Sequence, residues 1–330
     1  MMIDLQSFNR KIVLLVFLLF QILRSEAHVN NPPCGEHELL SFMCDLCSCS
    51  TSSGSFGFGT LSNTNFIGLR YIYQNFESKD GIFENSLTSM ETFNTYQLWA
   101  QVPLNEKVFL SVNIPYQDLE RKIDNTTESI NGIGDGSVMG WYKLQFYKKQ
   151  KDSVDFNMNR EVSGHSLLFG IGLKLPTGKF EEALADNVNP GFQVGTGSFD
   201  GIFSMGYNYG KDKFGVNTLM SYYLKGENKN EYRFGNQFSY SMNFYTVFQK
   251  EKINIMPFIG FSGDIYDAII QYGETLKDTD GNITNATIGS EVILKKIILG
   301  VNYTLPVHQD LFGGNVESKN RFSLYLNYAL

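Results

Sequence analysis

Period-two alternation of apolar and polar residues is the feature that most constrains the fold of this chain. Between Tyr232 and Phe248 the even positions are mostly aromatic or apolar, and the odd positions are mostly small or polar. Successive side chains of a β-strand point to opposite faces, so such a strand separates an apolar from a polar environment. Similar alternation occurs at 108–116, 166–175 and 297–305. The chain is therefore predicted to be an all-β protein.

Twelve segments of the chain fit this alternating pattern. They begin near residues 65, 92, 107, 134, 165, 198, 213, 231, 252, 285, 295 and 321. Most of them span about 10 residues or more, the length that a tilted transmembrane β-strand needs. We therefore predict a closed antiparallel transmembrane β-barrel of about twelve strands. A soluble β-sandwich is the alternative, but it would need a second sheet to cover the aromatic faces.

The connections between these segments alternate in length. Short turns are expected at 104–107, 210–213, 249–252 and 294–296. Longer polar loops are expected near 75–91, 117–133, 177–197, 270–284 and 307–320, with a shorter loop at 225–231. Outer-membrane barrels have short periplasmic turns, longer external loops and both termini in the periplasm. The pattern predicts this location and orientation, and the long charged connection at 148–164 is its exception.

The C-terminal residues alternate up to the end of the chain. Phe322, Leu324, Leu326, Tyr328 and Leu330 alternate with Ser323, Tyr325, Asn327 and Ala329. A chain that ends inside an amphipathic strand is typical of a barrel whose last strand pairs with its first, because closure removes both exposed edges. The segment also resembles the terminal signal read by the barrel assembly machinery. We expect this machinery and outer-membrane lipid as partners.

The N-terminal residues read as an export signal. A basic pair at 10–11 precedes an apolar run over 12–23, and Ser25 and Ala27 are small residues at positions −3 and −1 of a cleavage site. The run is shorter than the roughly 20 residues of a membrane-spanning helix. The predicted organisation is a signal peptide at 1–27, a periplasmic Cys-rich segment at 28–64 and an outer-membrane β-barrel at 65–330.

All four cysteines follow the predicted cleavage site closely. With one histidine they form a set of soft or borderline ligands suited to Cu or Zn. The candidate ligands are Cys34, His37, Cys44, Cys47 and Cys49. Four cysteines in an oxidising compartment equally favour two disulfides, with three connectivities. Thiol–disulfide exchange with a periplasmic partner is a third alternative, and no other cofactor is expected.

Charged residues on the polar faces of the strands are the second set of candidates. If the alternation holds, six of them point into the lumen. They are Arg70, Lys174, Asp200, Arg233, Asp264 and Glu291. Charges of mixed sign inside a barrel can set ion or solute preference. The alternative is that they pair with each other and fill the interior, and about twelve strands predict a narrow or partly blocked pore.

Several other functions are disfavoured by the sequence. The net charge of −7 argues against nucleic acid as a partner, because phosphate binding needs a clustered basic face. The glycine-rich stretch 131–143 lacks the strand–loop–helix setting of a dinucleotide loop, so its glycines are better explained by a turn. The histidines are scattered, and no nucleophile or acid–base pair stands out. We do not expect an enzyme.

Three motifs carry a resemblance to a known family. "GIGDGSVMGWYKL", "GIGLKLPTGKF" and "NPGFQVGTGSFDG" occur in this order between residues 132 and 201. They resemble an outer-membrane barrel family described as transporters of the meta-cleavage pathway of phenol degradation. The composition of the chain, which is rich in aromatic residues, Asn and Lys, also resembles that of Bacteroidetes proteins. In those proteins, similar barrels carry a Cys-rich segment after the signal peptide. The resemblance implies a barrel that handles small aromatic solutes.

Two functional hypotheses follow. The first is an outer-membrane channel for the passive passage of a small solute, which the resemblance suggests is aromatic and the cysteines suggest is a metal ion. The second is an outer-membrane anchor whose Cys-rich segment recruits a periplasmic partner or binds Cu or Zn. Deletion of residues 28–60 distinguishes them, because only the second hypothesis makes this segment essential.

Overall fold

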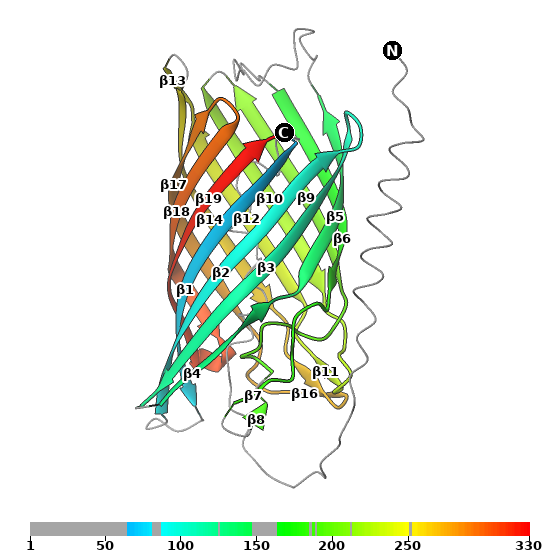
Figure 1. Ribbon diagram of the computed structural model, residues 1–330, viewed down its shortest axis with the longest axis vertical. Helices are drawn as coiled ribbons and strands as arrows, with labels where there is room; N and C mark the ends of the chain where they lie inside the picture. Colours follow the sequence, from blue (N-terminus) through cyan, green and yellow to red (C-terminus); the bar gives the residue numbers. More distant parts are fainter. Residues whose placement is uncertain are drawn as a thin grey trace. The chain divides into compact units, whose positions relative to one another are not determined.

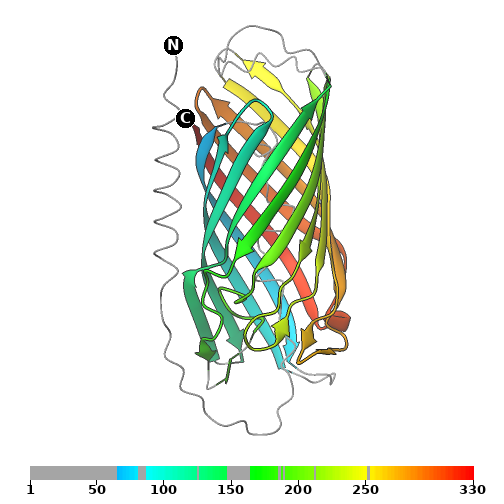
Figure 2. The same ribbon diagram turned by 90° about the vertical axis from the view of Figure 1, so that its right-hand side faces the viewer.

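The computed structural model describes residues 65–80, 87–124, 126–146, 164–184, 187–188, 190–211, 213–250 and 253–330. Twelve long strands form the wall of a single antiparallel barrel (Figures 1 and 2). They are β1 (Phe66–Asp80), β2 (Leu87–Pro103), β3 (Val108–Ile123), β5 (Gly136–Gln145), β6 (Gly164–Leu175), β9 (Asp200–Lys211), β10 (Phe214–Leu224), β12 (Gln237–Thr246), β14 (Ile253–Tyr266), β17 (Gly281–Leu294), β18 (Ile297–Leu311) and β19 (Val316–Ala329). No helix among these residues is long and apolar enough to cross a membrane.

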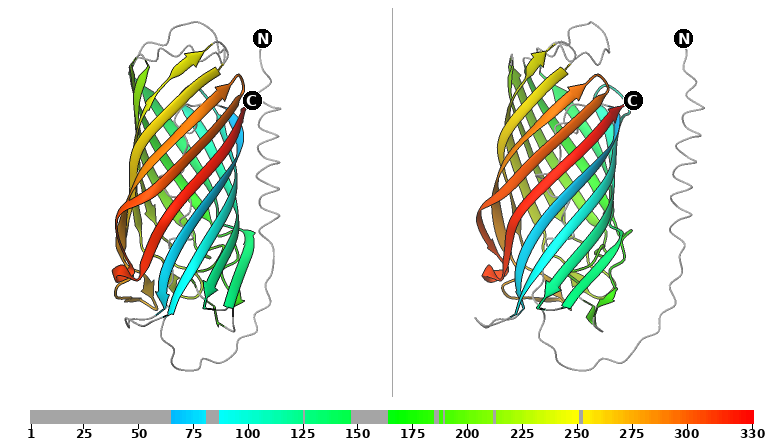
Figure 3. Two further views of the ribbon diagram at one scale, coloured as in Figure 1. Left: turned by 90° about the vertical axis from the view of Figure 1, so that its left-hand side faces the viewer. Right: turned by 60° about the vertical axis from the view of Figure 1, so that its left-hand side comes forward.

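The barrel closes through its first and last strands. β1 pairs with β19 from Phe66 opposite Ala329 to Ser78 opposite Val316. Figure 3 shows β19 beside β1, and the pairing of β12 with β14 completes the ring. The predicted all-β closed barrel of about twelve strands is confirmed. Closure leaves no unpaired sheet edge along this seam, as a lipid environment requires.

The two faces of each wall strand differ in the predicted way. Outward positions carry large apolar side chains, such as Leu69 (60% exposed), Ile171 (64%) and Ile259 (61%). Inward positions are mostly polar and buried, such as Gln97, Gln237 and Asn327. An apolar outer band around a polar interior is the arrangement of a transmembrane β-barrel.

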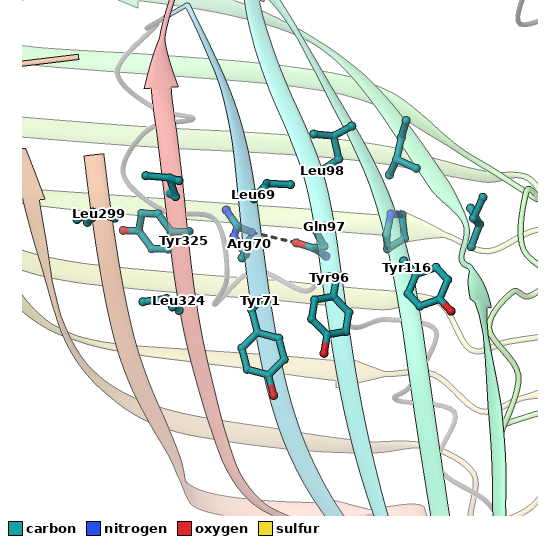
Figure 4. A pocket seen from close by; sticks show the side chains of 14 residues that line it. Leu69, Arg70, Tyr71, Tyr96, Gln97, Leu98, Tyr116, Leu299, Leu324 and Tyr325 are labelled. Carbon is teal, nitrogen blue, oxygen red and sulfur yellow. Dashed lines mark hydrogen bonds between the residues drawn. The ribbon is translucent and has the colours of Figure 1, made fainter. Parts of the chain in front are cut away.

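A row of tyrosines crosses the outer face of three neighbouring strands. Tyr71 on β1, Tyr96 on β2 and Tyr116 on β3 lie at one level of the wall (Figure 4). Their ring centroids are 5.2 Å apart for the first pair and 6.5 Å for the second. Tyrosines with one apolar and one polar end gather at the membrane–water interface. The row therefore marks one edge of the apolar band.

The two ends of the barrel are built differently. We call the end at which β1 begins and β19 ends the terminal end, and the opposite one the loop end. Strands β2 and β3, β9 and β10, β13 (Phe248–Lys250) and β14, and β17 and β18 approach each other at the terminal end, where the short turns at 104–107, 210–213, 249–252 and 294–296 were predicted. The loop end carries the segments 176–199, 225–236 and 267–280, with η4 (Phe312–Gly314) between β18 and β19.

Three small strand pairings accompany these loop-end segments and the adjoining wall. β7 (Ala183–Leu184) pairs with β8 (Asn187–Val188). β11 (Tyr232–Arg233), β15 (Ile270–Gln271) and β16 (Glu274–Thr275) form a small sheet. Figure 1 shows β7, β8, β11 and β16 at the end of the barrel away from the C-terminus. At the terminal end, β13 (Phe248–Lys250) pairs with β14.

Several sequence predictions about loops and strand ends were wrong. Strands β1 and β2 extend into the loop predicted at 75–91, and β18 and β19 extend into the loop predicted at 307–320. The predicted loop at 117–133 is a hairpin instead, because β3 continues to Ile123 and β4 (Thr126–Ile133) returns along it. The strand predicted from Tyr232 to Phe248 is divided, because residues 234–236 leave the ladder and wall strand β12 begins only at Gln237. Residues 117–133 are mostly polar at even and odd positions alike, whereas the alternation continues through residues 234–236 outside the ladder. The sequence pattern therefore does not reveal where backbone pairing starts or stops.

A β-bulge interrupts the wall between β4 and β5. Along β3 the pairing advances three positions, from Asn113 to Tyr116, while the partner advances four, from Ser137 to Ile133. One extra residue in a strand disrupts the ladder locally and redirects a side chain. Here the redirected residue is Asp135, which lies between the two strand segments and is buried. β6 pairs with β5 but not with β4, so the wall beyond Gly136 has a different neighbour.

Candidate functional site in the barrel interior

The six predicted lumen-facing charges occupy three kinds of place. Arg70, Asp264 and Glu291 lie on inward positions of β1, β14 and β17 and are buried. Lys174 is near the last residue of β6, and Asp200 is the first residue of β9, both close to the loop end of the barrel. They are also buried and point inward. Arg233 is not in the wall at all. It lies on β11, because the strand predicted to carry it breaks before Gln237.

Lys174 and Asp200 belong to a buried charge network. Lys174 Nζ lies 2.9 Å from Asp135 Oδ2 and 3.1 Å from Asp200 Oδ2, and Lys225 Nζ lies 3.4 Å from Asp200 Oδ2. Ser198 donates a hydrogen bond to Asp200 at 2.9 Å. Two aspartates and two lysines balance in charge, as a buried cluster requires. These charges pair with each other and are not left open to a solute.

The network ties the segment 176–199 to the inside of the wall. Asp135 Oδ1 accepts a hydrogen bond from Gly178 N at 2.9 Å. Asp135 Oδ2 accepts two from Thr196, at 2.9 Å from the backbone and 2.7 Å from the hydroxyl. Lys174 Nζ also donates to the Thr196 hydroxyl. A carboxylate with this many donors is a strong anchor, because each bond to a charged group contributes more than a neutral one.

The three motifs of the family resemblance meet in this network. Asp135 comes from the first motif, Lys174 and Gly178 from the second, and Thr196 and Asp200 from the third. The glycines of the first motif were predicted to form a turn, which the bulge at Asp135 supports in part. The role of Asp135 was not predicted, because its partners are 39 to 61 residues away in the sequence.

An apolar cluster fills the interior at the loop end, which we call the mouth cluster. Its members come from the inner wall and from the loop-end segments. They are Phe76, Phe93, Leu119, Ile130, Phe192, Val194, Tyr232, Phe234, Ile269, Ile283, Leu311, Phe312 and Val316. Phe192 is fully buried, and its ring lies 6.0 Å from that of Phe93 and 5.1 Å from the guanidinium carbon of Arg121.

An exposed ion pair joins two of the loop-end segments at their surface. Glu181 lies 2.7 Å from Lys229 Nζ and accepts a hydrogen bond from Asn230 at 3.0 Å. Partial burial acts to raise the pKa of Glu181, but the hydrogen bonds from Lys229 and Asn230 outweigh it and lower the pKa. Such a surface pair contributes little to stability by itself. Phe192 and Phe234, which come from the same two segments, are buried in the mouth cluster.

A second inward group lies on β19, β1 and β2. The Arg70 guanidinium carbon lies 4.1 Å from the centroid of the Trp99 ring and 5.8 Å from that of Tyr325. Arg70 Nη1 donates to Gln97 Oε1 at 3.4 Å, and the Tyr325 hydroxyl donates to Glu291. Figure 4 shows Arg70 between Gln97 and Tyr325 of the neighbouring strands. We call Arg70, Gln97, Trp99 and Tyr325 the arginine patch.

Asp264 has its own local partners. Its Oδ1 accepts hydrogen bonds from Ser239 at 2.5 Å and from Gln237 at 3.0 Å, both on the neighbouring strand β12. These short polar residues satisfy the carboxylate inside the wall. The sequence predicted the inward direction of Asp264 but not these partners.

The outer surface over the arginine patch is slightly hollowed. The hollow has a volume of about 610 Å³ and is lined mostly by outward leucines and the tyrosine row. Figure 4 labels Leu69, Leu98, Leu299 and Leu324 among these residues. These leucines come from outward positions of the wall strands, and Arg70, Gln97 and Tyr325 also border the hollow.

The family assignment rests on a comparison of sequences. A model of the family described as "Putative MetA-pathway of phenol degradation" matches residues 85–256, which is more than half of the chain. The chain belongs to this family. The match covers the wall from β2 to the start of β14 and includes all three network motifs, so the buried charge network lies within the MetA-pathway family region. No protein of curated function matches the chain in sequence.

Solved structures resemble this MetA-pathway family member to different degrees. The COG4313 outer membrane channel from Pseudomonas putida F1 is similar with a TM-score of 0.60 and 13% identity, over 81% of this chain and 96% of that one. The β domain of the Bordetella autotransporter BrkA has a TM-score of 0.44 and 8% identity, over 81% and 100%. The NanC porin has a TM-score of 0.44 and 10% identity, over 80% and 100%. The first likeness establishes a common fold.

The predicted metal ligands Cys34, His37, Cys44, Cys47 and Cys49 lie outside the described residues, as do the predicted signal peptide and most of the 148–164 connection. Within the described part of this MetA-pathway family member, no group of three or more His, Cys, Asp or Glu side chains could hold a metal ion. The Cu or Zn site, the disulfides and the exchange with a partner therefore stay predictions.

Proposed function

We propose that this protein is an outer-membrane channel for the passive passage of a small aromatic or otherwise apolar solute. The apolar outer band and the closed twelve-stranded wall suit a lipid bilayer. The short turns at the terminal end favour periplasmic termini, because outer-membrane barrels place their short connections there. The family description and the channel fold support the same role. No enzymatic step is part of the proposal.

The mouth cluster is the observation that carries the choice of solute. Its aromatic members Phe76, Phe93, Phe192 and Phe234 are buried inside a barrel whose other inward side chains are mainly polar. A hydrated ion loses its water on entering such a region at a high cost in free energy, whereas an aromatic solute does not. We therefore favour an aromatic solute over the metal ion that the cysteines suggested.

Uptake by intact cells tests this proposal. The full chain is expressed in a porin-deficient Gram-negative host, and the initial uptake rates of radiolabelled phenol and glucose are compared with the empty host. We expect phenol uptake to rise severalfold and glucose uptake to change little. Equal acceleration of both solutes would indicate a general porin, and no acceleration of either would overturn the proposal. A heat-modifiable gel shift of the expressed protein checks that the barrel is folded.

The Cys-rich segment at 28–64 is proposed to act separately, as a periplasmic appendage that recruits a partner or binds Cu or Zn. Deletion of residues 28–60 is expected to leave solute uptake largely intact while abolishing metal binding or partner capture. Thiol counting before and after reduction, with metal analysis of the same sample, distinguishes disulfides from a metal site. Loss of uptake upon deletion would assign the segment to the channel itself.

A further inference from the structure

The guanidinium of Arg70 has one edge without a partner. Arg70 is 5% exposed, and neither its Nε nor its Nη2 has a hydrogen-bond acceptor. The hydrogen bond that Nη1 donates to Gln97 Oε1 is long at 3.4 Å. Buried polar groups in proteins are nearly always paired, and a buried cation without an anion is costly. An arginine held in this state inside a channel indicates that something else supplies the acceptor.

The two free groups lie on the same edge of the guanidinium. Nε–H and Nη2–H point in parallel, and together they match the two oxygens of a carboxylate. Arg121 in the same barrel uses this edge on an acid, with Nε at 3.1 Å and Nη2 at 2.5 Å from Glu128 Oε2. Arg70 presents the same edge but has no acidic residue within 4 Å in the described part of the chain.

Other unpartnered polar atoms lie at inward positions of the same strands. Gln97 Nε2, Trp99 Nε1 and Asn327 Nδ2 are buried donors without acceptors, and Asn327 Oδ1 is a buried acceptor without a donor. Trp99 and Asn327 meet over Gly68, the inward neighbour of Arg70 on β1, where an added Cβ would lie 2.6 Å from Trp99 Nε1. The patch therefore offers mainly N–H groups, which suits a ligand that brings acceptor oxygens and a negative charge.

Glu291 is near enough for its charge to act on Arg70, but it supplies no acceptor to Nε or Nη2. Glu291 accepts the hydrogen bond of the Tyr325 hydroxyl, and the Tyr325 ring lies on the side of Arg70 opposite Gln97. The guanidinium carbon lies 4.1 Å from the centroid of the Trp99 ring, so an aromatic ring is next to the cation. The Nε–Nη2 edge is the part of Arg70 without a hydrogen-bond partner. Trp99 also contacts Phe66 and Tyr325, with centroids 4.7 and 6.4 Å away, so an apolar ligand body finds aromatic neighbours.

From this geometry we propose that the arginine patch binds the carboxylate of a small organic acid with an apolar body, through the Nε–Nη2 edge of Arg70. The inference rests on the proposed function, because such an acid reaches the patch only as a solute of the channel. It narrows the solute class from aromatic compounds in general to those that carry a carboxylate.

Tryptophan fluorescence of the full chain tests the binding. The chain has two tryptophans, and Trp141 lies apart from the patch, stacked on Phe109. In a Trp141→Phe background, Trp99 alone reports the site. Sodium benzoate and the uncharged benzyl alcohol are titrated in parallel at neutral pH, and the affinity ratio of the two probes is measured. We expect benzoate to bind more tightly than benzyl alcohol.

Substitution of Arg70 supplies the decisive comparison. Arg70→Gln is expected to lower the benzoate-to-benzyl alcohol affinity ratio by about tenfold or more, because two charge-assisted bonds are lost. Arg70→Lys keeps the charge but not the planar edge and should give an intermediate ratio. Arg233→Gln removes the same charge from β11, outside the wall, and should keep the wild-type ratio. The heat-modifiable gel shift verifies that each variant is folded.

The outcomes separate this inference from the proposed function. No benzoate binding by the wild type, or an affinity ratio that Arg70→Gln leaves unchanged, would overturn the carboxylate site. If phenol uptake by cells persists in that case, the channel proposal stands without it. If Arg70→Lys retains the full wild-type ratio, the site recognises charge alone, and the proposed bidentate hydrogen bonding by Nε and Nη2 is wrong.

Discussion

Asp135 and Thr196 are 61 residues apart in the sequence and share two hydrogen bonds through one carboxylate oxygen, Asp135 Oδ2. The first residue lies in the bulge between β4 and β5, and the second lies in the segment that connects β6 to β9. Their contact holds that segment against the inside of the wall, next to the mouth cluster. The bulge between β4 and β5 thus provides the carboxylate that fixes the 176–199 segment at the loop end of the barrel.

Removal of the Asp135 carboxylate should loosen the loop end. Asp135→Ala leaves Lys174 with one fewer anion and takes the acceptor from Thr196 and Gly178. Loss of one partner of a buried ion pair costs about 3–5 kcal/mol. We expect a higher ion conductance of the full chain in planar bilayers, because the 176–199 segment leaves the wall more often.

A matched control for Asp135→Ala is Glu120→Gln. Glu120 pairs with Lys122 at 2.8 Å, but both side chains are exposed. An exposed pair contributes about 0–1 kcal/mol, so the conductance should not change. Identical conductance of Asp135→Ala and the wild type would show that the network does not hold the segment in place.

A side chain at Gly195 should separate two backbone segments. A Cβ at Gly195 would lie 2.5 Å from the backbone carbonyl of Gly178, whereas a Cβ at Gly140 would meet nothing closer than 3.8 Å. Lys179 is next to Gly178, and its side chain is exposed. Gly195→Ala should therefore make the backbone after Lys179 easier for trypsin to cleave in limited digestion, and Gly140→Ala should not. Equal resistance of both variants would mean that the two segments can move apart without loss of their anchor.

Truncation of Phe192 should impair the selectivity of the mouth. Phe192 is fully buried in the mouth cluster, and truncation of a buried phenylalanine costs about 3–5 kcal/mol through lost burial and a cavity. In the uptake experiment, Phe192→Ala should accelerate glucose entry relative to phenol. Phe199→Ala is the control, since Phe199 is 62% exposed on the outer face. A wild-type preference for phenol in Phe192→Ala would remove the mouth cluster from the solute route.

A charge on the outer band should destabilise the barrel in lipid. Ile171 is 64% exposed at an outward position of β6, and arginine near the bilayer midplane of a barrel costs about 2–4 kcal/mol. Ile171→Arg should lower the urea midpoint of unfolding in lipid vesicles. Met90→Arg is the control and should change the midpoint much less. Met90 lies six positions beyond Tyr96 towards the loop end, and the tyrosine row marks the edge of the apolar band. If both variants unfold at the wild-type midpoint, the face that carries Ile171 does not contact lipid.

The strand pattern could be predicted because it is local. Whether Leu69 or Arg70 faces lipid depends only on the parity of the position, and that parity is visible in the sequence. Backbone pairing is less local. Residues 117–133 are mostly polar and were predicted to form a loop, although they form the end of β3 and the hairpin with β4. The break after Arg233 is also hidden, because its side chains keep alternating while the backbone leaves the ladder.

The sequence by itself determined the fold class, the number of wall strands, the closing pair of strands and the inward direction of Arg70, Asp264 and Glu291. Only the tertiary structure decided which inward charges have partners. Lys174 and Asp200 pair because β6 and β9 are neighbours in register, and Asp135 joins them because a single extra residue turns it inward. Arg70 keeps an open edge because its neighbours across the ladder are Gln97 and Tyr325, neither of which is an anion. Pairing of charges depends on which strands meet and at what register, and that information is spread over the whole chain.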